Sequence, residues 1–257
     1  MLTSRPRLGL MLVVGLFVLL CTVPLVNLPI ALVSSSEAEA ALEGSTALED
    51  PEIRGILAQP TLHRQIPRIR FASDRRTYEF LASHPPLASQ LAKRLQPQLE
   101  GYIVTRVEQG VYTIEDGGAL RGEARLIAAT GDQHIYRFQG EFRSLANLLH
   151  FTGRMVVIFR YREVRDGSRS YIDSDPNFYL RIDHLFFHVI TKLLSPAITS
   201  IVDRRVKMIV EASHKLFDQI RTDPDGLYRQ MSTWPEVHPE DLEAFRQTFL
   251  SRGVAMR

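Results

Sequence analysis

The chain has 257 residues, of which 45% are hydrophobic, 23% charged and 9% aromatic, and its formal net charge at pH 7 is +2. This composition excludes a disordered chain, and 15 glycines and 14 prolines are too few for a collagen-like or low-complexity one. The single cysteine, Cys21, excludes a disulfide framework, and the single long apolar run excludes a membrane protein with many spans. A charge this close to neutral gives no reason to expect a nucleic-acid partner.

Residues 1–40 form a hydrophobic leader. Arg5 and Arg7 precede an apolar run, residues 8–33, that contains no charged side chain. A positive flank followed by an apolar segment is the order of an export signal or a membrane anchor. Residues 38–40 (Ala-Glu-Ala) have the small-x-small form of a signal-peptidase site, whereas the apolar run is also long enough to span a bilayer. We therefore expect export, with the chain either released into the periplasm or anchored to the cell membrane through residues 8–33.

The region after the leader predicts a linker and two short helices. Residues 41–62 are mixed in composition and predict a linker that includes one short helix. Residues 63–76 carry five arginines and one aspartate, and we interpret them as a solvated strand and turn; contact with anionic headgroups at a membrane is the alternative. Residues 77–95 have a helical pattern that Pro85 and Pro86 divide into two helices.

Alternation of apolar and polar side chains then predicts antiparallel strands. The pattern is clearest at residues 120–127 and 155–164, where arginines alternate with apolar or aromatic side chains. Asp166-Gly167 predicts a tight hairpin before the last strand. The six expected strands are residues 102–107, 111–114, 120–127, 134–142, 155–164 and 171–182. Because most connections are short, we expect one antiparallel sheet with a dry aromatic face and a wet face rich in arginine.

A long amphipathic helix follows the expected strands. Ser195-Pro196 predicts its start, because a capping residue is followed by proline in the first turn. Apolar side chains then form one stripe as far as Ile220, and the turn residues at 222–226 predict the end of the helix. This stripe could cover the dry face of the sheet. The remaining residues, 222–257, are expected to form a tail with a short amphipathic helix at 239–251.

The order of these elements from Thr77 to Arg221 resembles the helix-grip fold of the START-like superfamily. The resemblance is carried by the small helices, the six expected strands and the long final helix. It implies an α+β domain, residues 63–221, whose curved antiparallel sheet grips the C-terminal helix and leaves a cavity between them. It also implies binding of a hydrophobic molecule, because the superfamily includes lipid-transfer domains, polyketide cyclases and carriers of hydrophobic ligands. Pro196 departs from the pattern, because it interrupts an otherwise continuous helical segment from Asp183.

The leading functional hypothesis is therefore a non-catalytic domain that binds a lipid or another hydrophobic small molecule between the sheet and the helix. Burial of apolar surface would supply the binding free energy. The expected ligand-contacting residues are aromatic residues of the predicted strands, namely Tyr102, Tyr136, Phe138, Phe159, Tyr161 and Tyr179.

The sequence predicts no metal and no cofactor. His184 and His188 have the spacing of a zinc pair, but a hydrolytic zinc helix also needs a glutamate in that turn and a third ligand. The glycine-rich residues 117–122 lack the Lys-Ser/Thr of a phosphate loop and are better explained as turn residues.

The acidic residues of the predicted strands do not suggest a catalytic pair. Glu115 and Asp116 are adjacent and would point to opposite faces of a strand. Asp173 and Asp175 point to the same face and could meet a cation, but Pro176 favours the edge of a loop at this position.

Two alternatives to a ligand carrier stay open. The first is an envelope structural or interaction module with a filled core, which would dock a protein partner through residues 239–251 or through the arginine-rich face. An exposed stripe of Leu242, Phe245 and Phe249 would favour it. The second is a cyclase- or hydrolase-like enzyme, which would need a polar cluster inside the cavity, such as His184 or His188 beside an acid. Independently of these alternatives, the apolar connection at residues 144–152 is expected either to pack on the core or to act as a gate over a cavity.

Overall fold

The structure is a computed structural model that describes residues 49–66, 68–117, 120–143, 150–183 and 196–250. For residue 64 and residues 196–206 it describes only the course of the backbone. The leader and the two histidines at 184 and 188 lie outside these ranges, as does most of the apolar connection that begins at residue 144. Within the described ranges, no helix combines the length and the apolarity needed to cross a membrane. Export therefore stays a prediction from the leader alone.

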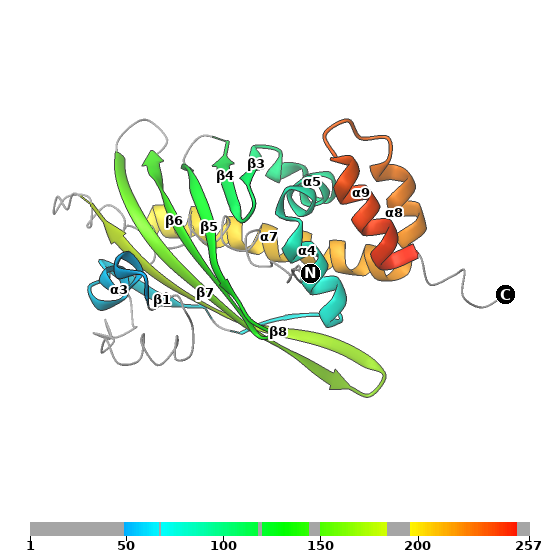
Figure 1. The fold of residues 1–257 in the computed structure, drawn as a ribbon, viewed down its shortest axis with the longest axis horizontal. Coiled ribbons are helices and arrows are strands. Elements are labelled where there is room, and N and C mark those ends of the chain that lie inside the picture. Colours follow the sequence, from blue (N-terminus) through cyan, green and yellow to red (C-terminus); the bar gives the residue numbers. More distant parts are fainter. Residues whose placement is uncertain (1–48, 67, 118–119, 144–149, 184–195, 251–257) are drawn as a thin grey trace.

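The described chain is an antiparallel sheet of eight strands that curves around a long C-terminal helix (Figure 1). The strands follow the order β1-β8-β7-β6-β5-β4-β3, and β2 also pairs with β8. Their bounds are β1 (Leu62–Gln65), β2 (Ile69–Phe71), β3 (Tyr102–Glu108), β4 (Val111–Asp116), β5 (Leu120–Ala129), β6 (Gln133–Arg143), β7 (His150–Asp166) and β8 (Arg169–Ile182). The α+β class and the six predicted strands, β3 to β8, are confirmed, and the architecture is the one that the helix-grip resemblance implies.

The helices begin where the sequence supplies caps and prolines. Their bounds are α3 (Pro51–Ala58), α4 (Arg75–Ser83), α5 (Pro85–Leu95), η2 (Pro97–Leu99), α7 (Pro196–Thr222), α8 (Pro224–Met231), α9 (Pro239–Phe245) and η4 (Arg246–Leu250). Asp74 accepts a hydrogen bond from the backbone N–H of Thr77 at 2.7 Å and so caps α4. The predicted start of the long helix at Pro196 is confirmed.

The two faces of the sheet bury two separate apolar clusters. The larger cluster lies on the face that α4, α5 and α7 cover. The smaller lies on the other face, where Ile53, Ile56 and Leu57 of α3 pack against β6, β7 and β8. The range expected to be a linker therefore contains a helix that is packed on the sheet.

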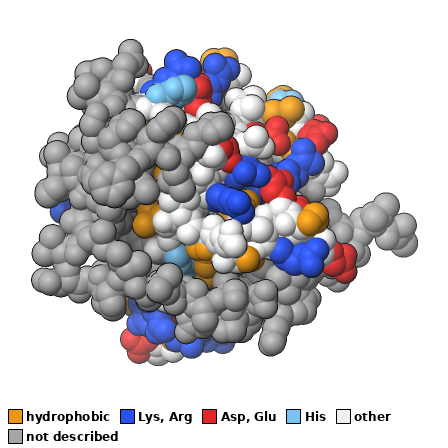
Figure 2. All heavy atoms as spheres, turned by 90° about the vertical axis from the view of Figure 1, so that its left-hand side faces the viewer, with side chains coloured by type: hydrophobic (Ala, Val, Ile, Leu, Met, Phe, Trp, Pro, Cys, Tyr) orange, Lys and Arg blue, Asp and Glu red, His pale blue; other side chains and the backbone are white. Residues whose placement is uncertain are grey.

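Ion pairs also link α3 to the sheet. Arg137 of β6 is hydrogen-bonded to Glu52, and Arg154 of β7 lies 3.7 Å from the same carboxylate and 2.6 Å from that of Asp183. In Figure 2, which shows the end of the molecule at the left of Figure 1, acidic and basic side chains lie next to one another among hydrophobic ones. The arginines of this part of the sheet are thus largely compensated by carboxylates.

Residues 224–250, which follow α7, are part of the same core rather than a separate tail. Leu227, Met231, Val237 and Phe245 are buried in the larger cluster, and Leu242 and Phe249 pack against it half-buried. Docking of a protein partner through residues 239–251 would depend on an exposed apolar stripe. In the structure this stripe packs against the core of the same chain.

Pro176 lies inside β8, so the expectation of a loop edge at this position is wrong. It pairs with Phe159 of β7, and its carbonyl accepts a hydrogen bond from the N–H of Ile66 at 3.0 Å. On that side of β8 the pairing changes from β1 to β2, so the proline nitrogen lies at a break in the neighbouring strands. Proline is tolerated where a ladder is interrupted, because it has no N–H to donate.

Candidate functional site

The structure places the six aromatic residues predicted to contact a ligand on two different faces. Tyr102, Tyr136, Phe138, Phe159 and Tyr161 belong to the larger cluster beneath α4, α5 and α7. Tyr179 belongs to the smaller cluster on the opposite face, where its ring stacks on that of His63 at 4.5 Å between centroids. The structure thus brings five of the six together.

Three of these five aromatic residues are completely buried. Tyr136, Phe138 and Phe159 each have 0% of their surface exposed. The ring of Phe159 meets those of Tyr136 and Phe178 edge-on, at 6.2 and 6.3 Å between centroids. These three rings are therefore packed against other side chains.

An open pocket of about 590 Å³ lies at the C-terminal end of α7, between this helix and the hairpin that joins β7 and β8. In Figure 1 this hairpin extends beyond the rest of the sheet. The pocket is lined by residues of four segments: Ala72, Ser73, Asp74, Arg76, Thr77, Ser168, Arg169, Ser170, Tyr171, Phe217, Ile220, Arg221 and Phe249. Phe217 and Ile220 are buried and form its apolar side, whereas Arg76 and Arg169 are exposed.

Local sequence rules place these residues around the pocket. The Asp74 cap starts α4 directly after β2, so Arg76 falls in the first turn of the helix, beside the pocket. The two-residue turn after Asp166 has Gly167 at φ +58°, a conformation that glycine adopts without strain. This turn brings residues 168–171 back along β7 and toward the end of α7.

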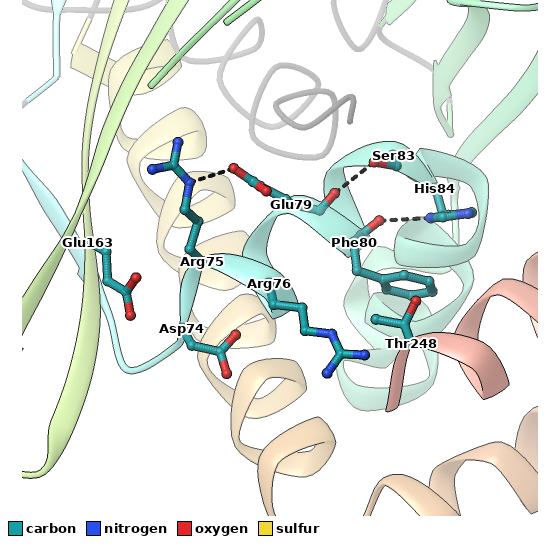
Figure 3. Close-up of a pocket in the computed structure, with 9 residues that line it drawn as sticks. All are labelled: Asp74, Arg75, Arg76, Glu79, Phe80, Ser83, His84, Glu163 and Thr248. Carbon is teal, nitrogen blue, oxygen red and sulfur yellow. Dashed lines mark hydrogen bonds and ion pairs between the residues drawn. The ribbon is translucent and has the colours of Figure 1, made fainter. Parts of the chain in front are cut away.

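A shallower groove of about 660 Å³ lies beside the pocket, and Asp74 and Arg76 line both (Figure 3). Two of its polar side chains, Ser83 and His84, bond to backbone carbonyls of α4. Ser83 donates to the carbonyl of Glu79 at 2.8 Å, and a ring nitrogen of His84 lies 2.8 Å from the carbonyl of Phe80. His84 is thus the residue at which α4 ends.

A cluster of tyrosines lies between this groove and the core. The hydroxyl of Tyr161 donates to the carboxylate of Glu79 at 3.2 Å, and Arg75 donates to the same carboxylate at 2.7 Å. The ring of Tyr78 lies 4.8 Å from that of Tyr161. Burial raises the pKa of both phenols, and the negative charge of Glu79 raises that of Tyr161 further. Both hydroxyls therefore stay protonated at neutral pH, and neither is an activated nucleophile.

We expect the raised pKa of Tyr78 to make the fold sensitive to alkali. A phenol in the unfolded chain ionises near pH 10, whereas the buried one keeps its proton, so the stability that it contributes is present below pH 10 and lost above it. The free energy of unfolding should fall between pH 8 and pH 11 in both the unmutated protein and Tyr78→Phe. In Tyr78→Phe this fall should be smaller by about 1 kcal/mol. The measurement is urea unfolding at both pH values, with the half-buried Tyr228→Phe as the control. Equal pH dependence in Tyr78→Phe and the unmutated protein would contradict this prediction.

Asp173 and Asp175 do meet cations, and these cations are arginines. Arg70 donates two hydrogen bonds to the buried carboxylate of Asp173, at 2.6 and 2.9 Å, and Arg68 lies 3.5 Å from Asp175. The hydrogen bond from Arg70 is the main reason that the pKa of Asp173 lies below its usual value. Across the parts of the chain that the structure describes, no three His, Cys, Asp or Glu side chains are placed to hold a metal ion.

Comparisons with known proteins find likeness in architecture. No family model matches the chain, and no curated protein matches it. A conserved protein from Geobacillus kaustophilus is 8% identical with a TM-score of 0.43, and the match covers 62% of this chain and 95% of that one. Norcoclaurine synthase from Thalictrum flavum is 15% identical with a TM-score of 0.36, covering 62% and 95% of the two chains. Major latex-like protein 151 from Panax ginseng is 14% identical with a TM-score of 0.33, covering 59% and 97%.

Sequence reasoning missed most of the residues that line this pocket. Ile220 and Phe217 were recognised as part of the helix stripe, but as cover for the sheet. Arg169 and Tyr171 flank the predicted hairpin, and no pattern in the sequence shows that the hairpin reaches the end of α7. The sequence does contain one signal that could have pointed to Arg76. A basic residue is unfavourable in the first turn of a helix, next to the positive end of the helix dipole, so its presence there is unusual.

Proposed function

We propose that this protein binds a small hydrophobic ligand in the pocket between the β7–β8 hairpin and the C-terminal end of α7. The observation that carries the proposal is the pocket itself, with a buried apolar side formed by Phe217 and Ile220. Its volume of about 590 Å³ lies in the range of small-molecule sites, which combine apolar walls with a few polar groups.

Apolar burial would supply most of the affinity. A ligand that loses about 200 Å² of apolar surface to the pocket gains roughly 5 kcal/mol at 25 cal/mol per Å². Lost translational and rotational freedom offsets part of this gain, so we expect moderate rather than very tight binding. The proposal includes export, which the leader predicts and which would bring the pocket to ligands outside the cytoplasm.

A structural module with a filled core is the second candidate. The close packing of Tyr136, Phe138 and Phe159 favours it, because the space expected to form a cavity at these residues is occupied. The two candidates differ in one measurable property, which is binding of a small apolar molecule at the pocket.

Filling the pocket tests the proposed function. Ala72 is exposed and lines the pocket, so the indole of Ala72→Trp should occupy part of its volume. We expect the dissociation constant for N-phenyl-1-naphthylamine, a neutral fluorescent probe, to rise at least about tenfold, measured by fluorescence titration of the full chain.

The matched control is Ala58→Trp, which adds the same side chain at the end of α3, on the other face of the sheet. It should keep the affinity of the unmutated protein and shows how much probe binds elsewhere, including the leader. Equal affinity in the two tryptophan variants, or no binding by the unmutated protein, would overturn the proposal and favour the structural module.

A further inference from the structure

The charges around the pocket are unequal. Three arginines line it, each from a different element: Arg76 from α4, Arg169 from β8 and Arg221 from α7. Asp74 is the single acidic residue among the described residues that line it. The pocket therefore combines an apolar side with an excess of positive charge.

Two of the four charged residues are already engaged. Arg221 is hydrogen-bonded to the carboxylate of Asp218, one turn earlier in α7. The carboxylate of Asp74 accepts the N–H of Thr77 at 2.7 Å and so is committed to the cap of α4. Within the described residues, neither Asp74 nor Asp218 forms an ion pair with Arg76 or Arg169.

Among the residues that the structure describes, Arg76 and Arg169 form no ion pair with a carboxylate. The guanidinium of Arg76 lies over the ring of Phe249, with its carbon 5.9 Å from the ring centroid. Within the described part of the chain, no ion pair joins Arg76 or Arg169 to an acidic side chain. The neighbouring Arg75 shows the contrast, because it is bonded to Glu79 at 2.7 Å. An uncompensated guanidinium beside an apolar surface is suited to carboxylate or phosphate, which it binds with paired hydrogen bonds.

We propose that the ligand is an anionic amphiphile, whose apolar body lies against Phe217 and Ile220 and whose carboxylate or phosphate binds Arg76 and Arg169. This inference rests on the proposed function and adds to it the chemical class of the ligand. The serine hydroxyls at 168 and 170, which also line the pocket, are further hydrogen-bond donors for the anionic group.

Ligands that share one chain length and differ in the head group test the inference. Decanoate, decyl phosphate, decan-1-ol and decylamine each compete with N-phenyl-1-naphthylamine for the full chain. We expect either anion to bind about tenfold or more tightly than the alcohol, and the amine to bind more weakly than the alcohol. Higher ionic strength should reduce the advantage of the anions and leave the affinity for the alcohol unchanged.

Arginine variants locate the anion site. Arg76→Gln and Arg169→Gln should each lower the affinity for decanoate about five- to tenfold and leave that for decan-1-ol within twofold. Retained binding of the alcohol also shows that a variant is folded. The control is Arg165→Gln, which removes an exposed arginine from the same hairpin but outside the set that lines the pocket, and which should bind both ligands normally.

The failure of this inference is distinguishable from that of the proposed function. Equal affinity for decanoate and decan-1-ol would overturn the proposal that the ligand is anionic. The proposal that the pocket binds a hydrophobic ligand would still stand. A preference for the anions that survives in both arginine variants would also overturn it, because the anion would then bind elsewhere. No binding of any of the four ligands or of the probe would overturn the proposed function.

Discussion

Replacing Gly122 by alanine is expected to destabilise the protein by about 3 kcal/mol or more, because there is no room for a β-carbon. Gly122 of β5 pairs with Gly140 of β6, and the ring of Phe138 lies against both glycines. A β-carbon on Gly122 would lie 2.4 Å from the carbonyl oxygen of Gln139 and 2.5 Å from the Phe138 ring. The carbonyl belongs to the backbone of the neighbouring strand, so relief of the contact would separate two central strands or displace a fully buried ring.

The measurement for Gly122→Ala is the free energy of unfolding in urea. Gly140→Ala should have a similar cost, because its β-carbon would lie 2.5 Å from the carbonyl oxygen of Arg121. Gly55→Ala in α3 is the matched control: its nearest neighbour would be 3.7 Å away, and alanine favours a helix by about 1 kcal/mol over glycine. If all three variants were equally stable, β5 and β6 would not approach each other as the structure shows.

The strands were predictable because each long strand has one face in water and one face in the core. At residues 120–127 this environment appears directly as arginine and glutamate alternating with apolar or small residues, and the structure confirms the strand. For residues 63–76 a strand and a turn were expected, whereas the structure has two strands there, β1 and β2, whose four and three residues are too few for alternation to separate them. The start of α7 was predictable for a different reason, since the combination of serine cap and proline is a local signal.

The part of the core formed after α7 was not predictable in the same way. The turn residues at 222–226 end a helix, but they do not show whether the chain then leaves the domain or returns to it. The structure shows a return, with Phe245 of α9 packed against Phe80 of α4 at 5.6 Å between ring centroids. This contact joins residues far apart in the sequence and depends on tertiary packing alone.

Tyr179 shows why the expected ligand site could be predicted only in part. It lies between Phe178 and Leu180, so three consecutive residues of β8 are apolar or aromatic and alternation does not identify the inner face. Both faces are buried here, because α3 covers the outer one. The pocket at the end of α7 was harder to predict, since four separate segments form it and their relative positions follow from the curvature of the sheet.

Phe159→Ala is expected to lower the free energy of unfolding by about 4 kcal/mol. Phe159 has 0% of its surface exposed, and its ring contacts two other aromatic rings in the middle of the core. Truncation would leave a void that the surrounding side chains can fill only partly, so lost burial and lost packing add together. The affinity for N-phenyl-1-naphthylamine should change little, because Phe159 is not among the described residues that line the pocket.

A second variant separates packing from ligand binding. Tyr171 lines the pocket and is half-buried, so Tyr171→Ala should cost only about 1 kcal/mol of stability but weaken binding of the probe severalfold. Urea unfolding and fluorescence titration of both variants give the comparison. A small loss of stability in Phe159→Ala together with a changed probe affinity would show that Phe159 borders an open cavity, and the ligand site would then lie beneath α7, where the sequence predicted it. The opposite result, with stability lost in Phe159→Ala and affinity lost in Tyr171→Ala, would assign packing to the aromatic residues of the sheet and ligand binding to the end of the helix.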